Sequence, residues 1–144
     1  MTIVYDDDRA RLDVDRIHGW LASSYWSPGI AKSLVEKVIA GSHCLGAYRG
    51  DDQIGFARMI TDHAIFAWLA DVWVDESARG YRIGHGLVQW FLDHPDFAGI
   101  RRFALVTADA HGLYADMGFA PLVRPDRYME RIAPELAAAL RVAT

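Results

Sequence analysis

The sequence predicts an α+β domain in which helices flank a central, twisted, mostly antiparallel sheet. Apolar and β-branched residues fill three consecutive segments, residues 43–49, 53–60 and 65–74, and short polar turns separate them, which is typical of hairpins. Segments before and after these strands carry apolar residues at helical spacing. Strands and helices do not alternate regularly, so a parallel sheet built from repeated βαβ units is not expected.

The N-terminal part is expected to hold one short strand and two helices. Residues 2–5 are the strand. Asp13 or Asp15 is placed to cap a helix over residues 14–21, because a carboxylate before the first turn accepts hydrogen bonds from free amides. The second helix is expected over residues 30–40.

The third strand of the central group leads into a glycine-containing loop. A helix follows from residue 83 to about residue 93, where Pro95 prevents its continuation. Side chains alternate between the two faces of a strand. Regular alternation would put Leu69, Asp71 and Trp73 on one face of this strand and Ala70, Val72 and Val74 on the other.

The C-terminal part predicts a buried strand, a short helix and three further elements. Residues 103–106 are wholly apolar, as in a strand covered on both faces. Asp109 can cap a helix over residues 110–117. The remaining elements are strands at residues 119–123 and 128–132 and an alanine-rich terminal helix within residues 134–144.

Composition and charge are those of one folded domain covering residues 1–144. No apolar run reaches the length of a membrane span, and the acidic N-terminal residues lack the apolar core of a signal peptide, so we expect a cytoplasmic protein without a membrane partner. The single cysteine, Cys44, excludes an internal disulfide. A net charge of −4 argues against nucleic acid as a partner.

The loop at residues 79–84 predicts a binding site for pyrophosphate. Its glycines let the backbone approach a ligand closely, and the first amides of the following helix have no partner inside the helix. The helix dipole favours negative charge at that end, and Arg79 and Arg82 add positive side chains. The alternative is that the glycines only shape a tight turn and allow the helix to pack.

This loop resembles the acetyl-CoA loop of the GNAT acetyltransferase superfamily, in which Arg/Gln-x-x-Gly-x-Gly/Ala follows a strand. Here it reads Arg79-x-x-Arg82-x-Gly84, so Arg82 must reach the conformation of the middle glycine with a side chain attached. The LYADMGF segment at residues 113–119 resembles the family's Leu-Tyr-x-x-x-Gly-Phe segment. Two motifs in the right order are more specific than either alone. The order of elements also matches this family, with the terminal helix as an addition.

The resemblance implies an N-acetyltransferase that moves an acetyl group from acetyl-CoA to a primary amine by direct attack in a ternary complex. The acceptor, a small-molecule or peptide amine, is not specified, no metal is implied, and a homodimer is expected from the family only. Backbone groups at the end of the third strand would bind the pantetheine arm, and the loop amides would hold the pyrophosphate. The cofactor residues implied are Val72, Trp73, Val74, Arg79, Gly80, Tyr81, Arg82, Ile83 and Gly84.

Two residues are the candidates for catalysis. The resemblance places Tyr114 beside the cofactor sulfur, and a phenol with a reference pKa of about 10 is protonated at neutral pH, so Tyr114 is the predicted general acid. The alternative is a core tyrosine. Asp71 is the candidate base, because partial desolvation makes a carboxylate more basic. The alternatives are an Asp71 tied to an arginine or to backbone, with His111 or His43 as the base.

Aromatic residues mark the expected acceptor site. Tyr25 and Trp26 lie in the connection between the first two helices, which often walls the acceptor site in this family, and Tyr128 would join them from a C-terminal strand. They could hold an amine by cation–π attraction, or equally anchor the loop to the core. Gly112, inside a short helix, would either let the cofactor arm approach or make a small-residue packing contact. A non-catalytic acyl-CoA-binding module on the same fold is the alternative function, which Tyr114 disfavours.

Overall fold

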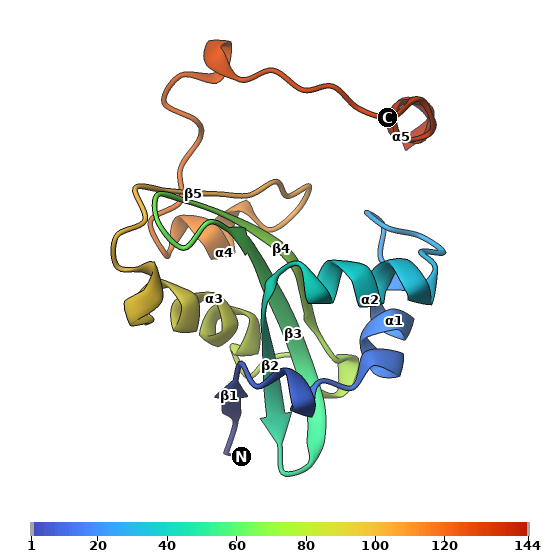
Figure 1. Cartoon of the computed structure of the whole chain (residues 1–144), viewed down its shortest axis with the longest axis vertical. Coiled ribbons are helices and arrows are strands. Elements are labelled where there is room, and N and C mark those ends of the chain that lie inside the picture. The colour runs from blue at the N-terminus through green and yellow to red at the C-terminus, as the bar shows by residue number, and fades with distance from the viewer. Residues whose placement is uncertain (1, 144) are drawn as a thin grey trace.

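The computed structural model describes residues 2–143, so the predicted domain bounds, residues 1 and 144, lie outside the described residues. One sheet has the strand order β1-β2-β3-β4-β5 (Figure 1). The first four strands are antiparallel neighbours and β5 is parallel to β4, which confirms the mostly antiparallel sheet. The strands are β1 Val4–Asp6, β2 His43–Arg49, β3 Asp52–Thr61, β4 Phe66–Val74 and β5 Arg102–Ala104.

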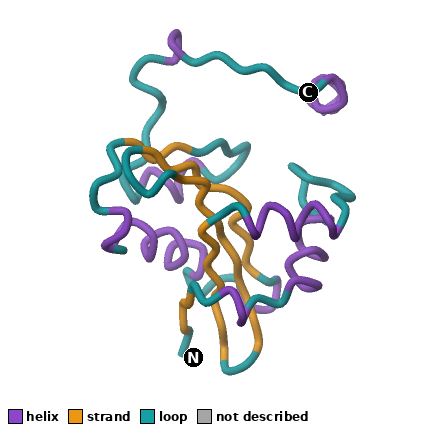
Figure 2. Tube along the Cα trace, viewed as in Figure 1, coloured by secondary structure: helices purple, strands orange, loops and turns teal. Residues whose placement is uncertain are grey.

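The helices lie close to their predicted positions (Figure 2). The Asp13 carboxylate caps the first of them by accepting from the Arg16 amide (3.0 Å). The expected Asp109 cap is wrong, because the helix that follows begins one residue later and Thr107 Oγ1 accepts from the Ala110 amide instead (3.0 Å). The α-helices are α1 Val14–Ala22, α2 Lys32–Ala40, α3 Ile83–Asp93, α4 His111–Ala115 and α5 Pro134–Ala143, and the short 3-10 helices are η1 Arg9–Arg11, η2 Glu76–Ala78, η3 Pro95–Phe97 and η4 Pro125–Arg127. None of the helices in the described part of the chain is long and apolar enough to cross a membrane.

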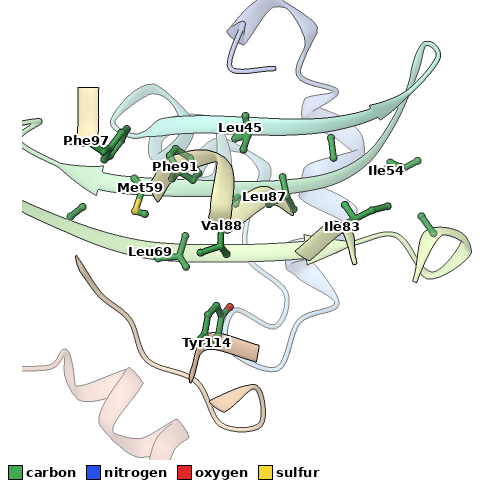
Figure 3. Packing of buried hydrophobic residues seen from close by; sticks show 14 residues of the cluster. Leu45, Ile54, Met59, Leu69, Ile83, Leu87, Val88, Phe91, Phe97 and Tyr114 are labelled. Atoms are coloured by element: carbon green, nitrogen blue, oxygen red, sulfur yellow. The ribbon is translucent and has the colours of Figure 1, made fainter. Parts of the chain in front are cut away.

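Helices cover both faces of the sheet. On one face, α3 contributes Ile83, Leu87, Val88 and Phe91 to a core with the sheet (Figure 3). On the other face, α1 and α2 pack against the sheet through a second apolar cluster. Strand β2 serves both cores because its side chains alternate. Leu45 and Ala47 belong to the α3 core, and Cys44 belongs to the α1/α2 core.

A β-bulge interrupts β4, and it overturns the predicted alternation of faces. Phe56 pairs with Trp73 but Arg58 pairs with Ala70, so β4 has one residue more than β3 between these pairs. Asp71 sits there with φ +55°, in the left-handed region. The extra residue reverses the side-chain phase. Leu69, Val72 and Val74 therefore pack with the α3 core, whereas Trp73 packs on the α1/α2 side.

The pairing between β4 and β5 is short. It joins only Phe66–Trp68 to Arg102–Ala104, although β4 continues to Val74. Beyond Trp68, one edge of β4 has β3 as its neighbour and the other edge has no strand beside it within residues 2–143. Because strand backbone groups must find hydrogen-bond partners, this edge is available to an extended ligand.

The strands predicted at residues 119–123 and 128–132 are wrong for this chain. These residues form no strand, and every residue from 120 to 131 is exposed. The chain leaves α4, passes through η4 and runs away from the sheet to α5, which stands apart from the other helices (Figure 1). The sequence pattern is that of strands, but a strand needs a neighbouring edge, and the path of the chain does not bring one alongside. The terminal helix itself is present, as α5.

Candidate active site

The loop between β4 and α3 has the backbone conformation that its sequence motif demands. Gly80 has φ +92°, which costs glycine little. Arg82 has φ 58° and ψ 30°, so it adopts the left-handed conformation with a full side chain attached, as the Arg79-x-x-Arg82-x-Gly84 pattern indicates. Arg82 directly precedes α3 and makes no side-chain cap there. The loop therefore leads into α3 without a side chain that caps the first turn of the helix.

The amides of the first turn of α3 are unused by the helix. The first helical hydrogen bond runs from the Gly86 amide to the Arg82 carbonyl (3.0 Å), so the amides of Ile83, Gly84 and His85 precede it without a helical partner. No acidic residue lies in this first turn. The partial positive charge of the helix terminus thus stays available to an anion.

A cavity of about 420 Å³ opens onto these amides. Of the residues predicted to hold the cofactor, Val74, Arg79, Gly80, Arg82, Ile83 and Gly84 line it. Val72, Trp73 and Tyr81 do not, and the Tyr81 side chain is 60% exposed. Ala78, His85, Leu113 and Asp116 complete the lining. The sequence analysis did not assign them to the cofactor site, although all four lie within or next to the two motifs. The cavity is therefore built by the two motifs together, the loop before α3 and the helix α4.

Charges around the cavity are mostly positive, with one opposing carboxylate. Arg79 Nε donates to the Val74 carbonyl (3.3 Å), and its guanidinium lies 5.7 Å from the Trp73 ring centroid. Arg82 adds a second cation, and Asp116 adds a negative charge. Asp75 anchors the start of the loop: it caps η2, and its hydrogen bond from the Ser77 hydroxyl holds the pKa of Asp75 below its usual value.

Tyr114 lies at the other end of the same region. It is buried, and its ring packs edge-to-face against Phe119 (centroids 5.9 Å apart). Figure 3 shows the Tyr114 ring beside β4, on the same side as the α3 core. Burial raises the pKa of Tyr114, and the nearby Tyr25 and Asp109 raise it further. The Tyr114 hydroxyl therefore keeps its proton well above neutral pH, as a proton donor requires.

The loop between α1 and α2 reaches this region through its two aromatic residues. The Tyr25 hydroxyl accepts from the Ala108 amide (3.1 Å), and Trp26 Nε1 donates to Asp71 Oδ1 (2.7 Å). The two rings meet edge-to-face (4.9 Å), and Trp26 also lies 5.9 Å from Trp73. Tyr25 is 58% exposed and Trp26 is 38% exposed, so both rings present surface to a ligand while their polar atoms hold the loop in place.

Each carboxylate oxygen of Asp71 accepts a hydrogen bond from a neighbouring side chain. Its second carboxylate oxygen accepts from Arg58 Nε (2.6 Å), and the paired side chains are only 8% and 13% exposed. Arg58 in turn donates to the Ser42 hydroxyl (3.0 Å). Sequence reasoning named a pairing with an arginine as an alternative role for Asp71, but it did not identify Arg58. The available signal was a lone arginine within an apolar strand that lies beside the strand of Asp71.

The remaining candidates lie elsewhere. The Tyr128 hydroxyl accepts from Arg102 Nη1 (2.8 Å) at the first residue of β5, away from Asp71, so within one chain it does not join Tyr25 and Trp26. His43 contacts Asp7 and His63 (both 2.9 Å), and His111 begins α4. At Gly112, no heavy atom lies within 4 Å of where a Cβ would stand, so close packing does not explain that glycine.

Fold and site together define a class: an α+β protein with a cleft at an uncapped helix N-terminus, directly after a bulged strand with one free edge. The model of the acetyltransferase (GNAT) domain family matches residues 40–121. The chain belongs to this family of acetyltransferases, whose members generally use acetyl-CoA.

Individual relatives agree with the family assignment. A crystal structure from Xanthomonas campestris pv. campestris, of a protein provisionally named a GNAT-family acetyltransferase, is 40% identical, covers 93% of this chain and 95% of its own, and has a TM-score of 0.89. A Gibberella zeae protein, also provisionally named an acetyltransferase, is 27% identical over 74% of this chain and 72% of its own length. A predicted acetyltransferase from Clostridium acetobutylicum, whose structure holds acetyl-CoA, shares the fold at 13% identity (TM-score 0.69, 91% of this chain and 96% of its own).

Proposed function

We propose that this protein is an acetyl-CoA-dependent N-acetyltransferase that acetylates a primary amine by direct attack in a ternary complex. The observation that carries the proposal is the uncapped N-terminus of α3. Three of its amides have no helical partner, and they open onto a cavity that Arg79 and Arg82 also line. A pyrophosphate is the anion whose charge and spread of oxygens suit such a site.

The residues around the cavity fit coenzyme A beyond its phosphates. The free edge of β4 from Leu69 to Val74 offers backbone donors and acceptors to the amide groups of an extended pantetheine arm, as an added strand would. That edge leads from the phosphate cavity at Val74 toward Asp71. Acetyl-CoA would supply the activated acetyl group there, and the residues of this chain would bind it, orient the acceptor and exchange protons.

Tyr114 is the proposed general acid. Its raised pKa keeps a proton on Oη at neutral pH, and this proton can be given to a leaving thiolate. Leu113, the residue before it, lines the phosphate cavity, so α4 carries both a cavity wall and the acid. A purely structural tyrosine would need neither arrangement.

Asp71 is better placed to orient neighbours than to take a proton directly. One oxygen accepts from Trp26 and the other from Arg58, so the lone pairs that face these donors are occupied. We propose that Asp71 positions Trp26 at the acceptor site. The base role predicted from the sequence would require a water bound to the remaining lone pairs of Asp71, and a pH profile of the Asp71→Asn variant separates the two roles.

The acceptor is proposed to be a primary amine that contacts the aromatic rings of Tyr25 and Trp26. Both rings are partly exposed next to the region of Tyr114. An aromatic face attracts an ammonium group before it loses its proton, and it tolerates either a small molecule or a peptide N-terminus. Tyr128 lies too far along the sheet to contribute from the same chain.

Calorimetry with coenzyme A tests the site, and Gly84 offers a matched pair of variants. A Cβ at Gly84 would make only ordinary contacts, 3.8 Å to Val74 and 3.9 Å to Leu113. Gly84→Asp places a carboxylate in the first turn of α3, which favours the helix but repels phosphate. We expect Gly84→Asp to lose coenzyme A binding at least tenfold more than the isosteric Gly84→Asn. Equal losses, or no heat with the native protein, would refute the phosphate site.

Thiol release from acetyl-CoA with a panel of primary amines tests the reaction itself. We expect at least one amine to raise thiol release above hydrolysis, with the acetylated amine found by mass spectrometry. If coenzyme A binds but no amine is acetylated, and Tyr114→Phe leaves the background unchanged, the non-catalytic acyl-CoA-binding alternative is favoured instead.

A further inference from the structure

Asp109, directly before α4, has a carboxylate that no neighbouring group uses. It does not cap the helix: Thr107 Oγ1 accepts from the amides of Asp109 (3.4 Å) and Ala110 (3.0 Å) instead. Asp109 is exposed, and its carboxylate takes part in none of the hydrogen bonds or ion pairs described for residues 2–143. A negative charge without a counter-charge is therefore available to a ligand at this position.

This carboxylate lies next to the proposed acceptor site. The Tyr25 hydroxyl accepts from the Ala108 amide (3.1 Å), so the loop between α1 and α2 contacts the residue just before Asp109. Tyr114 belongs to the helix that begins after Asp109, and its amide donates to the Ala110 carbonyl (3.3 Å). Burial raises the pKa of Tyr114, and the charge of Asp109 is close enough to raise it further. Asp109 therefore borders both the aromatic wall and the proposed acid.

The residues around the acceptor site lie at two depths. Tyr114 is 9% exposed, and the Asp71 side chain is 8% exposed. Tyr25 is 58% exposed, and Asp109 is exposed as well. The nitrogen that reacts has to reach the thioester beside the buried Tyr114, so the rest of the acceptor extends outward past Tyr25. The outer end of a bound acceptor is thus close to the free carboxylate of Asp109.

The charges at these two depths are not equivalent. The inner carboxylate, Asp71, is balanced by Arg58, whose Nε donates to it at 2.6 Å. The outer carboxylate, Asp109, stands beside the exposed ring of Tyr25 without such a partner among the described residues. A carboxylate and an aromatic face together bind an ammonium group, through charge-assisted hydrogen bonds and cation–π attraction. The net charge of −4 also draws cations toward the protein.

We propose that Asp109 selects acceptors that carry a second positive charge besides the amine that is acetylated. The reacting nitrogen lies beside Tyr114, and the second ammonium group lies between the Asp109 carboxylate and the Tyr25 ring. This inference rests on the proposed function, and it narrows the acceptor from any primary amine to a diamine or a similarly charged amine. An acceptor with a carboxylate at its outer end is repelled by the same charge.

The alternative role of Asp109 is structural. An acidic residue before a helix favours the positive end of the helix dipole, and Asp109 directly precedes the N-cap residue of α4. That role affects the stability of the protein, but it gives no preference between amines of different charge. The choice of amine therefore separates the two roles.

Thiol release with matched amines tests the preference. Putrescine and cadaverine are compared with n-butylamine and n-pentylamine, which have the same carbon chains but only one amino group. We expect kcat/KM to be higher for the diamines by roughly tenfold or more. Asp109→Asn should abolish this difference by raising KM for the diamines. Asp51→Asn removes the same charge from the exposed turn between β2 and β3, and it should keep the difference. Equal use of both kinds of amine by the native protein, or a preference that survives Asp109→Asn, overturns the inference.

Calorimetry separates this inference from the proposed reaction. Putrescine is titrated into the protein saturated with coenzyme A, which has no acetyl group, so that binding alone is measured. We expect binding by the native protein and by Asp51→Asn, and binding weaker by roughly tenfold or more in Asp109→Asn. If the diamine binds through Asp109 but no amine is acetylated, the reaction is refuted and the ammonium site stands. If amines are acetylated but diamine binding does not depend on Asp109, the ammonium site is refuted and the reaction stands. A native protein that binds no diamine also refutes the ammonium site.

Discussion

Trp26 Nε1 donates to Asp71 Oδ1 at 2.7 Å, which ties the loop between α1 and α2 to the bulge of β4. Asp71 has φ +55° and interrupts the regular pairing of β4. The same residue holds Trp26 beside Trp73. Arg58 holds the same carboxylate from the neighbouring strand. The bulge therefore organises the proposed acceptor site as well as the edge of the sheet.

Trp26→Phe should weaken acceptor binding without unfolding the protein. The change removes the indole N–H but keeps an aromatic ring and the Asp71–Arg58 pair. We expect a loss of stability within about 1 kcal/mol and a several-fold rise in KM for the amine, with an unchanged Kd for coenzyme A. Steady-state kinetics and calorimetry check this. An unchanged amine KM would show that the loop does not wall the acceptor site.

Asp71→Asn is the companion change, and it should act mainly on the fold. It leaves the Arg58 guanidinium, which is only 13% exposed, without its counter-charge. We expect the free energy of unfolding to fall by about 3 kcal/mol, measured by urea denaturation. If Asp71 only positions Trp26, as we propose, kcat/KM of this variant should still fall at low pH as it does in the native protein. If that fall disappears, Asp71 is the group whose protonation causes it, and the direct base role is supported.

Tyr114→Phe should lower kcat while the cofactor still binds. A positioned acid contributes roughly 10²–10⁴-fold, so we expect a loss of at least 100-fold in kcat with coenzyme A affinity within twofold of native. The pKa of Tyr114 is raised by burial, so in the native enzyme the alkaline limb of the kcat profile should lie above pH 10. A variant with full activity would reduce Tyr114 to a packing role.

Arg82 offers a way to separate backbone strain from charge. Its φ of 58° is unfavourable for any residue with a Cβ, at a cost of about 1 kcal/mol. Arg82→Gly and Arg82→Ala remove the same cation, but only glycine relieves the conformation. We expect the glycine variant to be more stable than the alanine variant by about 1 kcal/mol in urea denaturation. Both should bind coenzyme A more weakly, by similar and salt-dependent factors.

Arg82 and Asp71 both have an unusual backbone conformation, but only that of Arg82 could be predicted from the sequence. The conformation of Arg82 followed from a local motif with a glycine position filled by arginine. Both residues have positive φ, but nothing near Asp71 in the sequence marks a bulge. One extra residue reversed the faces of Val72, Trp73 and Val74 relative to the predicted alternation. The ion pair with Arg58 depends on how β3 and β4 align, which is not a local property.

The C-terminal strands illustrate a second limit. Residues 119–123 and 128–132 have the composition of strands, and this part of the prediction was wrong for the single chain. Strand formation depends on a neighbouring edge, which local sequence does not specify. The main elements, the role of Asp13 as a cap and most of the cleft residues of the loop were predictable because each depends on adjacent residues. These cleft residues are Val74, Arg79, Gly80, Arg82, Ile83 and Gly84. Tyr128 was misplaced because its position depended on one of the missing strands.

Gly112→Ala should stabilise the fold and weaken cofactor binding. A Cβ there would meet no heavy atom within 4 Å, and alanine favours a helix over glycine by about 1 kcal/mol. If the free space beside α4 is where the cofactor arm passes, the added methyl should reduce coenzyme A affinity several-fold in calorimetry. Gly19→Ala in α1, where a Cβ is equally unobstructed, is the control and should stabilise without changing affinity.

Tyr48 should make the protein sensitive to alkali. Its side chain is buried, its hydroxyl has no hydrogen-bond partner among the described residues, and the Arg11 guanidinium lies 4.0 Å from the ring centroid. Burial raises the pKa of Tyr48 to about 12. The folded state therefore favours the neutral phenol. This contribution to stability is complete below the unfolded-state pKa of about 10 and is lost as the pH rises from 10 to 12.

Tyr48→Phe isolates this contribution. At neutral pH we expect the variant to equal or exceed the native protein in stability, by up to about 1 kcal/mol, because a buried hydroxyl without a partner is removed. Between pH 9 and pH 11 the advantage of the variant should grow, toward roughly 2–3 kcal/mol above pH 12. Cys44, whose pKa burial raises to about 11, titrates in both proteins and cancels in the comparison. Urea denaturation at pH 8, 9.5 and 11 measures the difference, and a constant difference across this range would mean that Tyr48 ionises as freely in the folded state as in the unfolded chain.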